Sequence, residues 1–478
     1  MTGAVAVGLD IGTTGVKALA VDARGSVVAR AESHYGLSQP RPGWSEQDPA
    51  DWWAGSEAAI AALGPLEVVG IGLSGQMHGL VALDERESVL RPAILWNDQR
   101  TAAECAEIER RIGLEQLIAL TGNRALTGFT APKLLWMREH EPELYARIRH
   151  VLLPKDYVRL RLCGERATDV ADASGTLLFG VAERRFSGAV LDALEVPQEW
   201  MPRVLESPEV SGTTPAGVPV AAGAGDCAAA ALGVGVGRPG PVSLVLGTSG
   251  VVFAALPAYE PDPQARVHVF CHAVPGSWHA MGVMLSAAGS LQWARDTFAP
   301  GVPFAALMAE AEAAPAGAGG ILFLPYLSGE RTPHADPDAR GALVGLSASH
   351  TRGDVLRAVL EGVAFGLADS FELLHALGVE ATIARASGGG ARSDLWLRIC
   401  ASVLAVPVAR MSVDEGSAFG AALLGGTAGG MFADAEAAVD ACVRVRDQID
   451  PEPAWIDLYA ERRERYRALY PALKDVLG

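Results

Sequence analysis

One pattern occurs twice in this sequence, once in each half, and it limits the architectures open to the chain. Each copy is an apolar strand, a tight turn of glycine with threonine or serine, and a second apolar strand. The copies are LDIGTTGVKALAV (residues 9–21) and SLVLGTSGVVFAAL (243–256). A chain of 478 residues is too long for one compact core. The repeat therefore predicts an internal duplication with two lobes.

The stretch between the halves, GVGVGRPGPV (233–242), is rich in glycine and proline and has no core pattern. We therefore expect an N-terminal lobe over 1–237 and a C-terminal lobe over 238–478. Apolar runs predict strands at 4–9, 16–21, 26–33 and from 68 into a glycine-rich turn at 79. Helical patterns follow the Asp-Pro at 48–49 and cover 101–120, 132–149, 354–377, 394–404 and 455–476.

Charge and cysteine usage limit the partners. The formal net charge of −17 disfavours nucleic acid and anionic membranes. An anionic ligand such as ATP would need local help from backbone N–H groups, a lysine or a metal. The six cysteines are scattered, with no C-x-x-C pair, and no signal peptide or spanning apolar run occurs. We therefore expect reduced thiols in the cytoplasm.

The paired turns are candidates for phosphate binding. Thr13, Thr14 and the flanking glycines can point N–H groups and hydroxyls at a phosphate, and Lys17 can add a positive charge. A single such turn is more often an ordinary β-turn, but two copies, each after an apolar strand, favour phosphate binding. No G-x-x-x-x-G-K-[ST] motif occurs, which excludes a P-loop enzyme.

Asp10 ends the first strand, directly before the first turn. A buried carboxylate needs a partner, and a hydrated Mg²⁺ carried in by a nucleotide is a suitable one. The alternative is an aspartate that caps its own turn.

The stretch VAAGAGDCAAAALG (220–233) contains G-x-G-x-x-A, a form of the dinucleotide-binding fingerprint. A dinucleotide site also needs an acid about 20 residues further on, and here no acid occurs between Cys227 and Tyr259. The second candidate, GVGVGRPG, leads into a strand and fits less well. The loop instead displays Asp226 ahead of a helix, as a general base for phosphoryl transfer to a hydroxyl requires.

Two histidine-containing stretches receive different interpretations. GQMHGL (75–80) brings Met77 and His78 to the end of a strand, where the imidazole could bind a polyol hydroxyl or be structural. HVFCHAVPGSWH (268–279) has a metal-like composition, but it alternates as a strand and lacks convergent ligand spacing, so we expect core packing.

Taken together, these segments resemble the FGGY carbohydrate kinases, and within that family the xylulokinase group, over nearly the whole chain. GFTAPKLLWMREH (128–140) and GALVGLSASHTRGDVLRAVLE (341–361) are similar to the two family signatures. The segments most similar to the xylulokinase group are GWSEQDP (43–49), GQMHG (75–79), RPAILWND (91–98), LLPKDY (152–157), VLGTSG (245–250) and FLPYLSGERTPH (323–334).

The resemblance implies an α/β fold of two ribonuclease-H-like lobes, of the actin and hexokinase ATPase type, with ATP in a central cleft. It implies phosphorylation of D-xylulose, with Mg²⁺ bound through the nucleotide near Asp10 and Asp226 as general base. The first lobe would hold the sugar and the second the nucleotide. Sugar contacts would come from Gln76, Met77, His78, Trp96, Asp226 and Cys227. ATP contacts would come from Thr13, Thr14, Lys17, Thr248, Ser249, Gln292, Gly389, Gly390 and Asp394. The enzyme would be cytoplasmic, a homodimer being one option.

One position departs from the family pattern. Xylulokinases usually carry asparagine after the catalytic aspartate, and here the residue is Cys227, a poor hydrogen-bonding group. Another ketose or polyol, such as L-ribulose or a D-arabitol-like substrate, is therefore the main alternative. An actin-like nucleotide switch is a second alternative, and a dinucleotide-dependent oxidoreductase a distant third.

Overall fold

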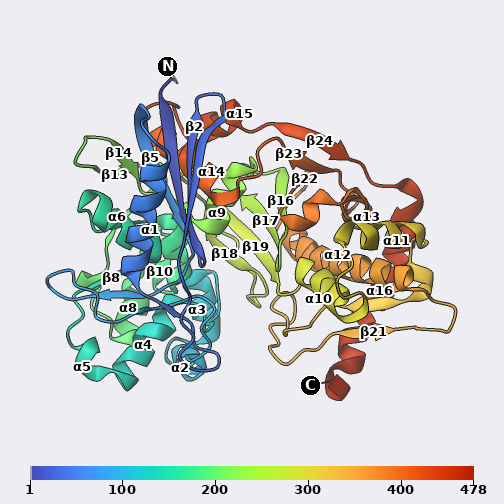
Figure 1. Cartoon of the computed structure of the whole chain (residues 1–478). Helices are drawn as coiled ribbons and strands as arrows, with labels where there is room; N and C mark the ends of the chain where they lie inside the picture. The colour runs from blue at the N-terminus through green and yellow to red at the C-terminus, as the bar shows by residue number, and fades with distance from the viewer. Residues whose placement is uncertain (1–2, 478) are drawn as a thin grey trace.

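The computed structural model describes residues 3–477 and contains two lobes, each built on a seven-stranded mixed sheet (Figure 1). The first sheet has the order β13-β14-β5-β1-β2-β3, and β15 pairs with β5 beside β14. Its strands are β1 (Val5–Ile11), β2 (Gly15–Asp22), β3 (Val27–His34), β5 (Val68–Gly75), β13 (Val210–Thr213), β14 (Pro219–Ala221) and β15 (Ala224–Gly225). The predicted strand–turn–strand start of the chain is confirmed.

The second sheet repeats the plan of the first. In both, three antiparallel strands precede parallel strands that return after helices, so β3-β2-β1-β5-β14 corresponds to β19-β17-β16-β22-β23. The strands are β16 (Pro241–Leu246), β17 (Gly250–Leu256), β18 (His268–Cys271), β19 (Trp278–Met284), β22 (Ile383–Ser387), β23 (Val408–Met411) and β24 (Val445–Ile449). The predicted duplication and the two ribonuclease-H-like lobes are confirmed.

Helices α9 (Asp226–Gly233) and α14 (Gly416–Ala428) occupy equivalent places in the two repeats and pack on each other where the lobes meet (Figure 1). Their backbones approach closely: a Cβ on Gly420 would lie 1.8 Å from the carbonyl oxygen of Ala229. Only glycine permits this approach. Helix α14 also packs against β1 and β5 of the first sheet, so the second half of the chain contributes to the core of the first lobe.

Residues between β5 and β13 add a helical region to the first lobe (Figure 1). The helical pattern predicted over 101–120 is present as two helices, α2 (Ala102–Ile112) and α3 (Leu114–Thr121), because Gly113, with φ of +87°, separates them. The helix predicted over 132–149 ends at His140, because the non-helical Glu141 precedes Pro142. The elements of this region and its approaches are α1 (Pro49–Ala62), β4 (Glu46–Gln47), β6 (Val81–Leu83), β7 (Ala93–Ile94), α2 (Ala102–Ile112), α3 (Leu114–Thr121), α4 (Thr130–His140), α5 (Pro142–Tyr145), β8 (His150–Leu152), α6 (Pro154–Cys163), β9 (Ala167–Asp169), α7 (Val170–Ala173), the 3₁₀ turn η1 (Ser174–Thr176), β10 (Phe179–Gly180), β11 (Arg185–Phe186), α8 (Gly188–Leu194), η2 (Gln198–Trp200) and β12 (Arg203–Leu205).

Helices pack against the second sheet around a large apolar core. The long helix α12 begins with a capping box, in which Thr351 and Asp354 satisfy each other's backbone N–H groups. No helix among residues 3–477 is both long and apolar enough to span a membrane. The elements here are α10 (Ala288–Phe298), α11 (Phe304–Ala313), η3 (Ala318–Gly320), β20 (Leu322–Leu324), β21 (Ala342–Val344), α12 (Arg352–Ala376), η4 (Gly389–Arg392), α13 (Asp394–Leu404), α15 (Ala435–Cys442) and α16 (Pro453–Leu477).

Strand membership changes from the first sheet to the second between β15 and β16. We propose that the boundary between the lobes lies at residue 237. Helix α14 belongs to the second half of the chain but packs against the first sheet.

Candidate active site

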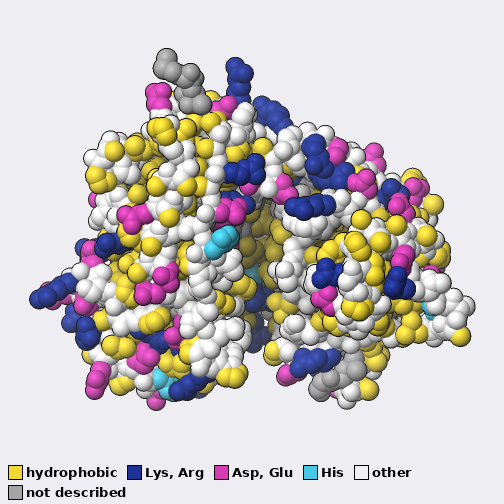
Figure 2. Space-filling model, viewed as in Figure 1, with side chains coloured by type: hydrophobic (Ala, Val, Ile, Leu, Met, Phe, Trp, Pro, Cys, Tyr) yellow, Lys and Arg dark blue, Asp and Glu magenta, His cyan; other side chains and the backbone are white. Residues whose placement is uncertain are grey.

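Three parallel strands of the first sheet end side by side. In the ladder Asp10 of β1 and Ala224 of β15 both pair with Ser74 of β5, and Gly225 pairs with Gly75. The carboxyl ends of parallel strands are the usual location of ligand sites in α/β sheets. The register therefore brings Asp10, the tip 76–78 and Asp226 to one edge, and Figure 2 shows a deep groove between the two halves of the molecule.

The loop that carries Asp226 lies tightly against β5. Gly223 has φ of +80°, and a Cβ there would lie 2.2 Å from the carbonyl oxygen of Leu73. A Cβ on Gly225 would lie 2.7 Å from Cγ of Met77. The two glycines therefore let the loop approach β5 closely, and Asp226 follows as the first residue of α9.

Asp226 is half-buried, and its Oδ1 accepts a hydrogen bond of 2.7 Å from the N–H of Cys227. Burial raises the pKa of Asp226 to about 6, and the negative charge of Asp10 adds to the effect. A carboxylate with this pKa is ionised at neutral pH and is more basic than an ordinary aspartate, which suits a general base.

This raised pKa gives a testable pH dependence. Because only the ionised form accepts a proton, we expect kcat/KM to rise with pH through about 6 and to level off above it. Initial rates between about pH 5 and pH 8, with Mg-ATP affinity measured at each pH, would check this. A profile that is flat across pH 6 would contradict it.

Asp10 is held at one oxygen and free at the other. Oδ2 accepts a 2.7 Å hydrogen bond from Ser417 at the start of α14, while the buried Oδ1 has no partner among residues 3–477. Burial raises the pKa of Asp10. Hydrated Mg²⁺ requires only one or two carboxylates, so one oriented carboxylate with a free oxygen fits such an ion.

His78 is held as a neutral imidazole. Its backbone is left-handed, with φ of +69°, and its Nδ1 lies 2.7 Å from the carbonyl oxygen of Gly175. Burial and then the charge of Lys133 lower the pKa of His78 to about 3. Since Nδ1 faces an acceptor, it carries the proton, and Nε2 is left as an acceptor for a hydroxyl. His78 is half-buried.

The other predicted sugar residues from the first half lie around this tip. Met77 is buried against Gly225. The buried Gln76 accepts a hydrogen bond of 3.3 Å from Thr13 and donates one of 2.9 Å to Gln47, so its amide already joins the tip to the first turn. Trp96 is 41% exposed, and its Nε1 donates to Thr13 Oγ1 at 3.1 Å.

The two glycine turns occupy equivalent positions in the two sheets. In the first, Thr14 is exposed beside Thr13. In the second, Thr248 and Ser249 are exposed, and the carbonyl oxygen of Thr248 accepts the N–H groups of Ala287 and Gly289 at the start of α10. These hydroxyls are accessible, and their contact with phosphate stays a prediction.

Lys17 is already engaged. It lies opposite Asp10 in the β1–β2 ladder, and its Nζ is 3.3 Å from Glu415 and 3.5 Å from Glu32. To face a phosphate, it would have to share or leave these carboxylates, and its predicted role stays untested.

The predicted nucleotide residues lie on the second lobe around the ends of β16 and β22. Gly389 is exposed with open space beside it, whereas Gly390 packs on Leu246 and Trp396. The exposed Asp394 forms a 2.6 Å ion pair with Arg410. Gln292 is exposed on α10 and donates to Asp296 at 2.6 Å.

A fully buried group of charges lies behind β5, next to this site. Lys155 Nζ is 2.6 Å from Asp156, 2.7 Å from Asp169 and 3.1 Å from Asp172, and all four side chains are inaccessible to solvent. We call these four residues, with Arg159, the Lys155 cluster. Asp169 caps α7, which leads to Gly175, the partner of His78. Arg159 donates to the carbonyl of Ala222, at the base of the loop that carries Asp226. The cluster therefore supports both the partner of His78 and the loop that carries Asp226.

The histidines of 268–279 are core residues, as predicted. His268, His272 and His279 are buried, burial lowers the pKa of each, and His279 stacks on Phe253 at 4.2 Å. Within residues 3–477 no group of metal-binding side chains is assembled.

Sequence reasoning missed three residues that touch this region: Ser417 and Glu415, which contact Asp10 and Lys17, and Arg331, whose positive charge acts on His78 and Cys227. Ser417 and Glu415 lie about 400 positions from their partners and carry no local signal. Arg331 lies in the family-like segment FLPYLSGERTPH but was given no role.

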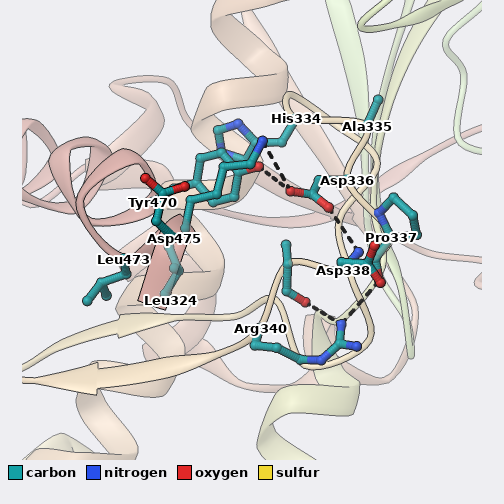
Figure 3. Close-up of a pocket in the computed structure, with 12 residues that line it drawn as sticks. Leu324, His334, Ala335, Asp336, Pro337, Asp338, Arg340, Tyr470, Leu473 and Asp475 are labelled. Carbon is teal, nitrogen blue, oxygen red and sulfur yellow. Dashed lines mark hydrogen bonds and ion pairs between the residues drawn. The ribbon is translucent and has the colours of Figure 1, made fainter. Parts of the chain in front are cut away.

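A pocket of about 410 Å³ lies away from this site, between the loop 334–340 and α16 (Figure 3). None of the predicted site residues lines it.

Comparisons with known proteins cover nearly the whole chain. Models of the FGGY family of carbohydrate kinases match it, the N-terminal domain over 5–233 and the C-terminal domain over 242–429. The xylulose kinase of Escherichia coli K12 is 43% identical over 493 aligned residues, covering 99% of this chain and 100% of that protein. The crystal structure of a "xyloylose kinase" from Brucella ovis superposes with a TM-score of 0.93 at 44% identity, covering 99% and 100% of the two chains. A gluconate kinase from Lactobacillus acidophilus superposes with a TM-score of 0.94 at 26% identity, covering 99% of each chain.

Proposed function

Because the chain belongs to the FGGY family of carbohydrate kinases, we propose that it transfers the γ-phosphoryl group of ATP to the 5-hydroxyl of D-xylulose. The products are ADP and D-xylulose 5-phosphate. The observation that carries the proposal is the placement of Asp226, a basic carboxylate at the edge where β1, β5 and β15 end. The near full-length similarity to proteins named xylulose kinase supports the choice of sugar.

In this reaction Asp226 accepts the proton of the 5-hydroxyl as that oxygen forms its bond to the γ-phosphorus. The bond from the γ-phosphorus to the bridging oxygen breaks, and ADP leaves. His78 Nε2 accepts a hydrogen bond from another sugar hydroxyl, which orients the sugar relative to Asp226. We call the proposed sugar-binding surface the sugar wall. It consists of His78 and Asp226 together with Met77, Gln76, Trp96 and Cys227. Such a reaction depends mainly on positioning and on charge neutralisation.

The nucleotide is proposed to lie between the two glycine turns, with the hydroxyls of Thr13, Thr14, Thr248 and Ser249 on its phosphates and Lys17 nearby. The adenosine would lie against Gly389, Gly390 and Asp394, near Gln292. Asp10 would hold a Mg²⁺ through its free Oδ1, and that ion neutralises phosphate charge when bound. Closure of the lobes excludes water, which otherwise competes as acceptor.

Because of Cys227, a substrate other than D-xylulose stays an alternative. Burial raises the pKa of its thiol well above the usual range, so it is present as a neutral, weakly hydrogen-bonding group. A different ketose, a polyol or a sugar acid would then be the acceptor, and the structural similarity to a gluconate kinase is a reason to include sugar acids.

The test is an ADP-release assay with Mg-ATP against D-xylulose, L-xylulose, D- and L-ribulose, xylitol, D-arabitol, glycerol and D-gluconate. We expect the highest kcat/KM for D-xylulose. Turnover of another sugar would support the proposed phosphoryl transfer but replace D-xylulose as the proposed substrate. ATP binding without any sugar-stimulated turnover would favour the nucleotide-switch alternative.

The homodimer and the cytoplasmic location expected from the sequence remain predictions. Sedimentation and fractionation of the native protein would test them.

A further inference from the structure

Arg331 belongs to the loop 325–341 between β20 and β21 of the second lobe. Its position is fixed along the edge of β19: Thr332 N–H donates to Val283 O at 3.0 Å, and Val283 N–H donates to Thr332 Oγ1 at 3.0 Å. The buried Glu330 accepts the N–H of Leu285 at 3.0 Å. Arg331 therefore lies on an anchored segment.

The far end of the same loop is also held. Figure 3 shows His334 lying against Tyr470 of α16, with ring centroids 3.7 Å apart, and Asp336 bonded to the hydroxyl of Tyr470. The loop is therefore fixed on both sides of Arg331.

Arg331 is half-buried and has no ion pair and no side-chain hydrogen bond to any residue in the range 3–477. Other buried arginines differ: Arg159 pairs with Asp156, and Arg357 pairs with Glu361 at 2.7 Å. None of its guanidinium nitrogens is fully buried, so these donors stay accessible. Arg331 is therefore an accessible, donor-rich group without a side-chain partner among residues 3–477.

The charge of Arg331 acts on residues in and next to the proposed sugar wall. After burial, it contributes to the lowered pKa values of His78 and His268, and it opposes the rise that burial gives to the pKa of Cys227. The wall is continuous between the lobes, because Phe129 has its ring 4.9 Å from that of His78 and 5.7 Å from that of His268. The hydroxyl of Thr332 donates to the carbonyl oxygen of Arg266 at 2.9 Å, two residues before His268, so the Arg331 loop lies beside this ring contact.

We propose that Arg331 is the sugar contact of the second lobe: its guanidinium donates hydrogen bonds to oxygen atoms of the ketose other than the hydroxyl oxygen that Asp226 deprotonates. Because His78 and Asp226 belong to the first lobe and Arg331 to the second, a sugar bound by all three holds the lobes together. This inference rests on the proposed function and deepens it.

The test uses Arg331→Met and Arg331→Lys in the full-length protein, with Arg340→Met as the matched control. Arg340 lies on the same loop, is exposed and, among the residues that the structure describes, donates only to the carbonyls of Pro337 and Ala339. Loss of a charge-assisted hydrogen bond predicts that Arg331→Met raises KM for D-xylulose about 10- to 100-fold. KM for ATP and sugar-independent ATP hydrolysis should stay within about twofold of wild type, and Arg331→Lys should restore part of the sugar affinity.

An unchanged sugar KM in a folded Arg331→Met variant would overturn the inference, and so would equal increases in the KM values of sugar and ATP. If Arg331→Met does not fold, the same comparison is made with Arg331→Lys, and an unchanged sugar KM there overturns it. The two proposals fail separately. Wild-type turnover of D-xylulose with an insensitive Arg331 removes only this inference. Absent D-xylulose turnover removes the proposed substrate, and Arg331 is then tested on the sugar that is turned over.

Discussion

Replacing Asp226 with asparagine is expected to lower kcat by about 10²- to 10⁴-fold, the usual contribution of a general base. The amide has nearly the same shape but cannot accept the proton of the sugar hydroxyl. Because the carboxylate is the only charged group replaced, ATP affinity should change little. Steady-state rates with the preferred sugar, together with ATP titration, measure both quantities.

Protein stability provides the control for this substitution. The pKa of Asp226 is raised in the fold, so its ionised form is disfavoured there, and above pH 6 the carboxylate lowers the stability of the native state. Asp226→Asn should therefore unfold at the same or a higher temperature near pH 8. Asp51→Asn, at an exposed carboxylate on α1, should leave kcat unchanged. A folded Asp226→Asn enzyme with wild-type kcat would exclude the proposed base.

The Lys155 cluster predicts the largest effect on stability. Lys155→Met would remove the cation that lies within 3.1 Å of three carboxylates, all inaccessible to solvent. Breaking a buried ion pair by removing one partner costs about 3–5 kcal/mol. We expect a decrease of this size in the free energy of unfolding, measured by urea denaturation, or loss of folded protein.

A second substitution separates charge from packing. Burial raises the pKa of Asp172 well above its ordinary value, so this carboxylate is the member least able to stay ionised. Adding Asp172→Asn to Lys155→Met should recover part of the lost stability, because one uncompensated acid disappears. Lys474→Met, at an exposed lysine of α16 whose Nζ is 3.6 Å from Asp336, should cost less than about 1 kcal/mol. Equal losses in the single and double variants would contradict a charge-based explanation.

The site could be predicted only in part. Asp226 and the tip Met77–His78 follow from turn chemistry within a few residues, and the structure brings them to one edge of the sheet. The contacts of Lys17 and Gln76 could not be predicted in this way, because they are made to Glu415 and Thr13, which are distant in the sequence. Arg331 has no local signal, since its unpaired state depends on how the loop 325–341 lies against β19.

The sequence by itself determined the paired strand–turn–strand units, the duplication, and the glycine loop that carries Asp226. These depend on backbone preferences and strand periodicity, which act between neighbouring residues. The tertiary structure alone decided that α14 packs into the first lobe, that Ser417 contacts Asp10, and that the loop carrying Arg331 is anchored on β19. Such features depend on burial and on contacts between residues hundreds of positions apart, which have no counterpart in a local pattern.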